Sequence, residues 1–196
     1  SLSVSRQSTR VSEAEYLDLE ATSAFKHEYL DGEVYLLAGA SENHNRVAMN
    51  VAGHLWAAAR GTSCRVLGSD MRLRITTSLE DGGERVVYYY PDVQVVCDPA
   101  DTDPLTKSRP CAIVEVSSPS TEAIDAREKL LAYRGLASLR SYLIVSQERR
   151  QVVHHYRDAQ GAWWKAELSG AGQVPLGCPE VVLDLDAIYG GVIGPG

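Results

Sequence analysis

Two short apolar segments, each carrying a single acidic residue, constrain this chain more than any other feature. Residues 90–96 read Tyr-Pro-Asp-Val-Gln-Val-Val, and residues 112–117 read Ala-Ile-Val-Glu-Val-Ser. Runs of this length that are rich in valine and isoleucine are typical of buried β-strands. Asp92 and Glu115 therefore lie in or beside a core. Two carboxylates on neighbouring buried strands repel each other and lose hydration, so the fold must supply a compensating group.

A divalent cation is one such compensating group. Mg²⁺ usually binds one or two carboxylates together with water and phosphate oxygens. Asp92 and Glu115 are therefore candidate metal ligands, and the Val116 carbonyl is a third candidate. The structural alternative is an aspartate in an edge-strand turn and a glutamate paired with an arginine.

The bulk properties predict one globular domain. The chain has 196 residues, of which 44% are hydrophobic and 23% charged, enough for a sizeable core. The net charge of −7 argues against broad coating of nucleic acid, although a local basic groove beside an acidic metal site is compatible with it. Neither a signal peptide nor an apolar run of about 20 residues is visible, so we expect no membrane association.

The four cysteines, Cys64, Cys97, Cys111 and Cys178, lack the CxxC spacing of a zinc knuckle. Cys97 and Cys111 lie in apolar strand-like runs, where a free thiol packs as a small hydrophobic group. We expect four reduced, buried thiols, and on that basis a cytoplasmic protein. A disulfide or a zinc role is the alternative.

Local signals predict helices and strands in alternation. A capping box at Ser12 starts a short helix that ends near Ala21, and Ser41 caps a longer helix over residues 42–60. The Asp31–Gly32 pair predicts a β-hairpin. Further strands are expected at 65–67, 71–75, 86–97 with a break at Pro91, 111–116, 141–145, 152–156 and 163–168, and a helix over 122–134. Residues 181–186 are expected to form a strand and a helical turn.

These elements predict one α/β (α+β) domain over residues 12–189, with a mixed, largely antiparallel sheet flanked by helices. Residues 1–11 are polar and are expected to form a disordered tail.

Several separated motifs resemble the Uma family of restriction-endonuclease-like proteins, in the PD-(D/E)xK nuclease superfamily. They are Tyr-Pro-Asp at 90–92, Val-Glu-Val-Ser-Ser-Pro-Ser-Thr at 114–121, Asp-x-x-x-Lys-x-x-x-Tyr at 125–133, Lys-His-Glu-Tyr-Leu-Asp-Gly-Glu at 26–33, Ala-Ser-x-x-His-Asn-Arg at 40–46 and Ser-Asp-Met-Arg-Leu-Arg-Ile at 69–75. The resemblance covers about residues 12–189. It implies a restriction-endonuclease-like core of a helix, three antiparallel strands, a helix and a further strand.

The resemblance also implies catalytic roles. Asp92 and Glu115 would ligate Mg²⁺ or Mn²⁺, and DNA would be the partner. The superfamily signature has a lysine two residues after the second acid, where this chain has Ser117. Lys129, on the following helix, is the candidate replacement that would orient water or stabilise charge on the phosphate. Its alternative is a surface salt bridge with Asp125, four residues earlier.

Three further residues are candidates for the same site. Asp70 precedes an alternating strand and is either a third metal-binding carboxylate or a hydrogen-bond anchor for its turn. Glu33 and His44 are weaker candidates, near the hairpin and in the first turn of the long helix. Arg72 and Arg74 share one strand face, where they would contact phosphate or face solvent.

The resulting hypothesis is a Mg²⁺-dependent endonuclease that hydrolyses DNA phosphodiester bonds as a homodimer. The alternative is a catalytically weak or inactive nuclease-fold protein that acts as a dimeric binding or regulatory module, favoured by Ser117 and the acidic balance. The chain contains no GxxxxGK[ST], GxGxxG or GxSxG motif, so we expect neither an organic cofactor nor a serine-hydrolase site.

Overall fold

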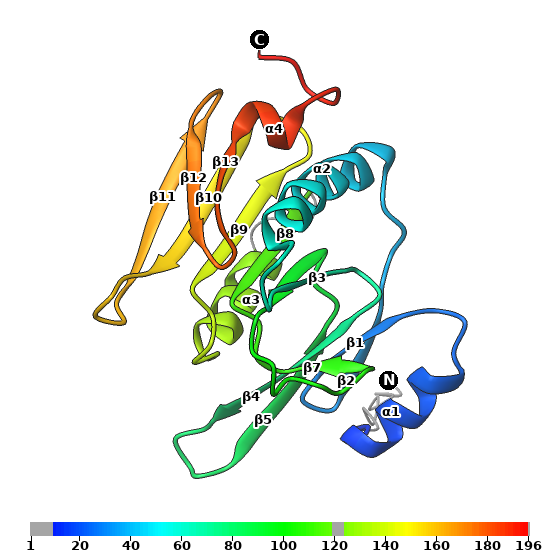
Figure 1. Ribbon diagram of the computed structural model, residues 1–196. Coiled ribbons are helices and arrows are strands. Elements are labelled where there is room, and N and C mark those ends of the chain that lie inside the picture. Colours follow the sequence, from blue (N-terminus) through cyan, green and yellow to red (C-terminus); the bar gives the residue numbers. More distant parts are fainter. Residues whose placement is uncertain (1–9, 119–123, 196) are drawn as a thin grey trace, which may run out of the picture.

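The computed structural model describes residues 10–118 and 124–195 (Figure 1). Within these ranges the helices are α1 (Glu13–Thr22), α2 (Glu42–Ala59), α3 (Ile124–Arg134) and α4 (Leu185–Tyr189). The strands are β1 (His27–Leu30), β2 (Glu33–Leu36), β3 (Arg65–Gly68), β4 (Arg72–Ser78), β5 (Glu84–Tyr89), β6 (Val93–Val96), β7 (Thr106–Lys107), β8 (Ala112–Ser117), β9 (Ser141–Ser146), β10 (Gln151–Arg157), β11 (Trp163–Ser169), β12 (Gln173–Gly177) and β13 (Glu180–Asp184). The end of the 114–121 motif and the start of the predicted helix over 122–134 lie outside the described residues.

The predicted fold class is confirmed, with the strands divided among separate sheets. A six-stranded sheet has the order β11-β10-β9-β8-β6-β3, and only its β8–β9 pair is parallel. Strand β8 lies between β6 and β9, which explains why Ala112, Ile113 and Val114 are all buried. The implied core of helix, antiparallel strands, helix and further strand corresponds to α2, then β3, β6 and β8, then α3 and β9.

Pro91 separates two strands that belong to different sheets. Strand β5 lies in a five-stranded sheet of order β2-β1-β5-β4-β7, whereas β6 lies in the six-stranded sheet. Proline has no N–H group to donate to a strand ladder, so regular pairing stops there. Asp92 consequently stands just before β6, where the chain passes from one sheet to the other. The short strands β7 and β12 were not predicted.

The β1–β2 hairpin turns on Asp31 and Gly32, as predicted. Both residues have positive φ, 45° and 103°, the conformation that two-residue hairpin turns favour. The backbone N–H of Val11 donates to the Gly32 carbonyl at 2.8 Å, and Arg10 pairs with Asp31 at 3.3 Å. Two residues of the predicted tail therefore contact the domain, and residues 1–9 lie outside the described part of the chain.

The two large sheets share buried contacts around α3. Tyr133 of α3 lies in one apolar cluster with Leu73 and Tyr89 of the five-stranded sheet, and with Ile113 and Tyr142 of the six-stranded sheet. Helix α2 packs on β3, β8, β13 and α4 (Figure 1). Both sheets therefore meet near α3. Asp92, just before β6, and Glu115, in β8, lie close to that junction.

The prediction of four reduced cysteines is wrong. Cys64 is joined to Cys97, and Cys111 to Cys178, by disulfide bonds. Antiparallel pairing of Arg65 with Val96 sets the first two cysteines opposite each other. These pairings are 33 and 67 residues apart in sequence, so local spacing did not reveal them.

The expected cytoplasmic location was inferred from reduced thiols, and the two disulfide bonds remove that argument. Among the described residues, none of the helices is both long and apolar enough to cross a membrane.

Candidate active site

Asp92 and Glu115 stand opposite each other on adjacent antiparallel strands. The β6–β8 register pairs Gln94 with Ile113 and Val93 with Val114. Continuing it by one residue sets Asp92 opposite Glu115, and opposed side chains on one face have Cβ atoms about 4.5–5.5 Å apart. The backbone N–H next to Glu115 also donates to Asp92, since Val116 N lies 2.7 Å from Asp92 Oδ2. Strand pairing therefore brings together the two acids that the sequence singled out.

Lys129 reaches this pair from α3. Its Nζ atom lies 3.2 Å from Glu115 Oε2 and 3.5 Å from Glu28 Oε1. Tyr133, one helical turn later, donates its hydroxyl to Glu115 Oε1 at 3.2 Å. The Lys129 side chain is only 9% exposed, so these are not surface contacts. The side chain of Asp125, the alternative partner, lies outside the described residues.

Lys129 is the predicted replacement for the lysine of the superfamily signature. Ser117, at the signature position, is the last residue of β8. The helix after β8 instead delivers the Lys129 ammonium to the second acid of the pair. This agrees with the predicted replacement, while the catalytic role of Lys129 stays a prediction.

Glu28 is a site residue that sequence reasoning missed. Its side chain is 13% exposed and meets Lys129 from β1, while its neighbour Tyr29 packs with Tyr16 in another cluster. The available signal was the place of Glu28 beside Tyr29 in a short strand, within one of the motifs that resemble the family. Glu33, which we had predicted instead, starts β2, is exposed and accepts a hydrogen bond from the Tyr35 hydroxyl.

His44 joins the site from the first turn of α2. Ser41 caps the helix by accepting from the His44 N–H at 3.1 Å, which fixes the start of that turn. The His44 Nε2 atom lies 3.2 Å from Asp92 Oδ2. This hydrogen bond raises the pKa of His44, against the opposing effect of burial. Among the described residues, its buried Nδ1 has no hydrogen-bond partner.

Asp70 and Arg74 have other partners. The Asp70 side chain is 96% exposed and pairs with Lys26 at 3.0 Å. Arg74 Nε lies 2.5 Å from Glu13 Oε1, so its charge is engaged by an acid of α1. Asp70 and Arg74 therefore do not contact the acidic pair. His44 contacts Asp92 directly, and Glu28 contacts Lys129.

The site carries more negative charge than its cations offset. Burial raises the pKa of Glu115 to about 7, and the nearby charges of Asp92 and Glu28 add to this effect, while Lys129 opposes it. Such a set of under-compensated carboxylates fits a hard divalent cation such as Mg²⁺ or Mn²⁺.

Within the described residues, three or more Cys, His or carboxylate ligand atoms come mutually within 4.8 Å only at Cys97, Cys111 and Cys178. Further ligands at the acidic pair would therefore be backbone carbonyl, water and phosphate oxygens, which suits Mg²⁺.

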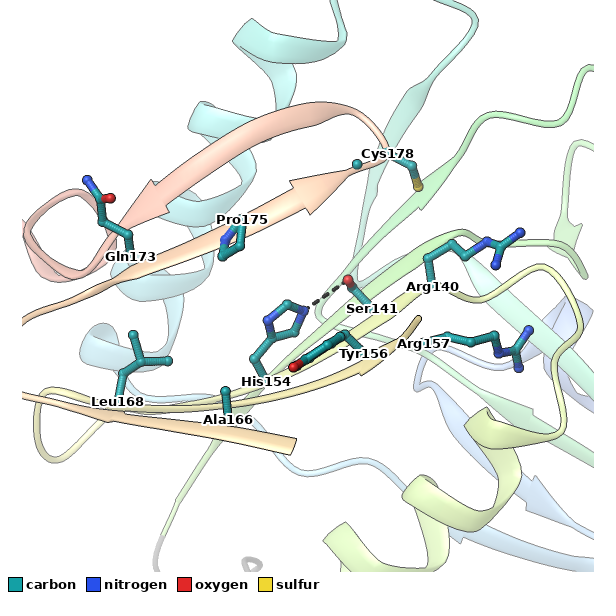
Figure 2. Close-up of a pocket in the computed structure, with 11 residues that line it drawn as sticks. Arg140, Ser141, His154, Tyr156, Arg157, Ala166, Leu168, Gln173, Pro175 and Cys178 are labelled. Atoms are coloured by element: carbon teal, nitrogen blue, oxygen red, sulfur yellow. Dashed lines mark hydrogen bonds between the residues drawn. The ribbon is translucent and has the colours of Figure 1, made fainter. Parts of the chain in front are cut away.

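A cavity of about 710 Å³ lies apart from these acids, beside the β12–β13 hairpin (Figure 2). Its lining includes His154, Tyr156, Pro175 and Cys178, but none of the residues around the acidic pair. His154 Nε2 lies 3.0 Å from Ser141 Oγ, and burial lowers the pKa of His154 to about 4. This cavity is thus lined by a neutral imidazole, not by a metal-binding acid.

Comparison with known proteins shows the family of the chain. Residues 13–187 match the model of the Uma2 family, whose description is "Putative restriction endonuclease". The match covers most of the chain, and the chain belongs to this family.

Two curated relatives and one solved structure are similar to the chain. "Uncharacterized protein slr1290" of Synechocystis sp. is 31% identical over 186 residues, covering 93% of each chain. "Uncharacterized protein sll1609" of the same organism is 33% identical over 160 residues, 80% of this chain and 86% of that protein. The structure is described as "a putative nuclease belonging to DUF820" from Anabaena variabilis. It aligns with a TM-score of 0.69 at 12% identity, over 92% of this chain and 98% of that one, and confirms the fold.

Proposed function

We propose that this protein is a divalent-cation-dependent endonuclease that hydrolyses phosphodiester bonds in DNA. The observation that carries this proposal is the β6–β8 register, which sets Asp92 opposite Glu115 with the Lys129 ammonium beside the second acid. Membership of a family described as "Putative restriction endonuclease" supports DNA as the substrate.

Asp92 and Glu115 would hold Mg²⁺ or Mn²⁺, which would supply a water of lowered pKa and neutralise charge on the phosphate. Two contacts orient the Asp92 carboxylate, from the Val116 N–H and from the His44 imidazole. These contacts hold one of its oxygens in place before substrate arrives, which lowers the entropic cost of assembling the site.

Lys129 supplies a fixed positive charge beside the acidic pair. In this position it can orient the attacking water or stabilise the charge that grows on the phosphate. Glu28 is a positioning residue, because it holds the Lys129 ammonium from the side of the five-stranded sheet. Lys129 therefore keeps one carboxylate partner even if Glu115 turns towards a cation.

Calorimetric titration of Mg²⁺ and Mn²⁺ into the purified protein tests the ligands, and cleavage of a supercoiled plasmid tests the reaction. Wild type should bind the cation and nick the plasmid. Asp92→Ala and Glu115→Ala should lose both properties and keep a native circular-dichroism spectrum. Asp70→Ala is the matched control, because that acid is exposed and pairs with Lys26; it should behave as wild type.

Plasmid cleavage by Asp92→Ala and Glu115→Ala at the wild-type rate would contradict the proposal. A wild-type chain that binds the cation and DNA but never cleaves would favour the alternative, a nuclease-fold binding or regulatory module. Light scattering on the same samples tests the predicted homodimer.

A further inference from the structure

The four cysteines of the chain form one continuous group of sulfur atoms. Cys64 is bonded to Cys97, and Cys111 to Cys178. The two disulfides also touch, since Cys97 Sγ lies 3.4 Å from Cys111 Sγ. The sulfur atoms of Cys97, Cys111 and Cys178 lie within 4.8 Å of one another. Four distant segments of the chain therefore bring their cysteine sulfur atoms to a single place.

Strand order explains this convergence. Strands β3, β6 and β8 are neighbours, and each is antiparallel to the next. Cys64 immediately precedes β3, Cys97 immediately follows β6, and Cys111 immediately precedes β8. Alternating strand directions thus place these cysteines at the same end of the sheet. Cys178, in the turn between β12 and β13, contacts this end, because Cys111 Sγ lies 3.5 Å from the Cys178 carbonyl oxygen.

This group is separate from the acidic pair. Asp92 precedes β6 and Cys97 follows it, while Cys111 precedes β8 and Glu115 lies in its second half. The cysteines and the acids therefore occupy opposite ends of the same two strands. At about 3.3 Å per residue, the four-residue step from Cys111 to Glu115 spans about 13 Å.

We propose that these four cysteines, when reduced, form a tetrathiolate site for Zn²⁺. Zinc binds four thiolates tetrahedrally at about 2.3 Å, which separates the sulfur atoms by about 3.8 Å. The 3.4 Å between Cys97 Sγ and Cys111 Sγ is close to that spacing. After reduction, the two sulfur atoms of each former disulfide must move apart by about 2 Å to reach this separation. Rotation about the Cα–Cβ bonds can supply that movement.

The chemistry of loading is a reduction followed by ligand exchange. Each disulfide takes two electrons and two protons from a dithiol reductant, which becomes a cyclic disulfide, and two cysteine thiols result. Zn²⁺ then binds four thiolates and releases four protons to solvent, so the loaded site has a net charge of −2. Arg140, whose backbone N–H donates to the Cys111 carbonyl at 2.9 Å, brings a positive charge to this region.

One of the four cysteines reaches a cavity, which offers a route for this exchange. All four cysteines are half-buried, and Cys178 lines the cavity of about 710 Å³ together with Arg140 (Figure 2). A reductant or a cation can therefore approach through this cavity. A bound zinc ion would tie the β12–β13 hairpin to the six-stranded sheet, as the Cys111–Cys178 disulfide does.

Cobalt titration of the full chain tests the site. The protein is reduced with dithiothreitol, freed of reductant without oxygen, and titrated with Co²⁺. We expect one thiolate-bound Co²⁺ per chain, with a thiolate-to-cobalt charge-transfer band and tetrahedral d–d bands that Zn²⁺ abolishes. Asp92→Ala is the control that excludes the acidic pair, and it should give the same spectrum.

Cys178→Ser identifies the ligand from the hairpin. This variant should lose about a quarter of the charge-transfer intensity and bind Co²⁺ at least about tenfold more weakly, since outer-shell changes alone have effects of about 10–100-fold. A folded, reduced chain without a thiolate–cobalt band would overturn the proposal, as would an unchanged band in Cys178→Ser. If reduction unfolds the chain, refolding on Zn²⁺ addition supports the site, and failure to refold overturns it.

Discussion

Lys129 Nζ lies 3.2 Å from Glu115 Oε2, and the two side chains are only 9% and 12% exposed. This contact joins α3 to the central strand β8 and brings a lysine to the second acid of the site. Because both charges are largely removed from water, each depends on the other for compensation, and Lys129 also pairs with Glu28.

Lys129→Met should separate the structural from the catalytic contribution of the lysine. It leaves Glu28 and Glu115 without their shared cation, and removing one partner of a buried pair costs about 3–5 kcal/mol. We expect urea denaturation in EDTA to show a loss of that size, and plasmid cleavage to disappear while Mn²⁺ still binds. Lys129→Arg is the control that keeps the charge and should lose less stability. Wild-type cleavage by Lys129→Met would exclude Lys129 from catalysis.

Glu115 should make the metal-free protein less stable as pH rises. Its pKa is raised from 4.5 to about 7, so the native state keeps a proton that the unfolded state has already released. The contribution of Glu115 is fully present below about pH 4.5 and is lost as pH rises to about 7, by up to about 3 kcal/mol.

Glu115→Gln should therefore remove this pH dependence. The measurement is the difference in unfolding free energy between wild type and variant, in EDTA, from about pH 4.5 to about pH 8. Parallel stability profiles for the two proteins would contradict the raised pKa. Saturating Mg²⁺ should flatten the wild-type profile, because a cation bound to the carboxylate displaces its proton.

His44 should titrate above its ordinary pKa of 6.5, chiefly because it is hydrogen-bonded to Asp92. The stabilising contact is fully present below pH 6.5 and is lost as pH rises through the raised pKa. In Asp92→Asn, burial remains without the charged partner, so the pKa of His44 should fall below the wild-type value. Titration of the His44 ring signals by NMR measures both values. Asp70→Asn serves as the control, and an unchanged pKa in Asp92→Asn would refute the pairing.

Glu28 should matter for cleavage, and Glu33 should not. Glu28 contacts Lys129 inside the site, whereas Glu33 is exposed on β2. We expect Glu28→Gln to lower the cleavage rate about tenfold or more with Mn²⁺ affinity little changed, as for other residues that position a catalytic group. Glu33→Gln is the matched control from the same hairpin. Equal rates in the two variants would mean that Glu28 does not position Lys129.

Local chemistry determined many features that can be recognised in the sequence alone. The Ser41 cap, the Asp31–Gly32 turn and the break at Pro91 depend on residues a few positions apart, and each occurs where it was predicted. Asp92 and Glu115 were recognisable because an acid within an apolar strand conflicts with its surroundings.

Only the tertiary structure decided which of these features meet. Glu28 rather than Glu33 contacts Lys129 because Glu28 lies within β1 and turns towards α3, whereas Glu33 starts β2 and is exposed. Cys111 and Cys178 meet across 67 residues because a hairpin folds back onto the end of β8. The physical reason is that side-chain periodicity specifies which face of an element is buried, whereas the choice of neighbouring element depends on packing across the whole chain.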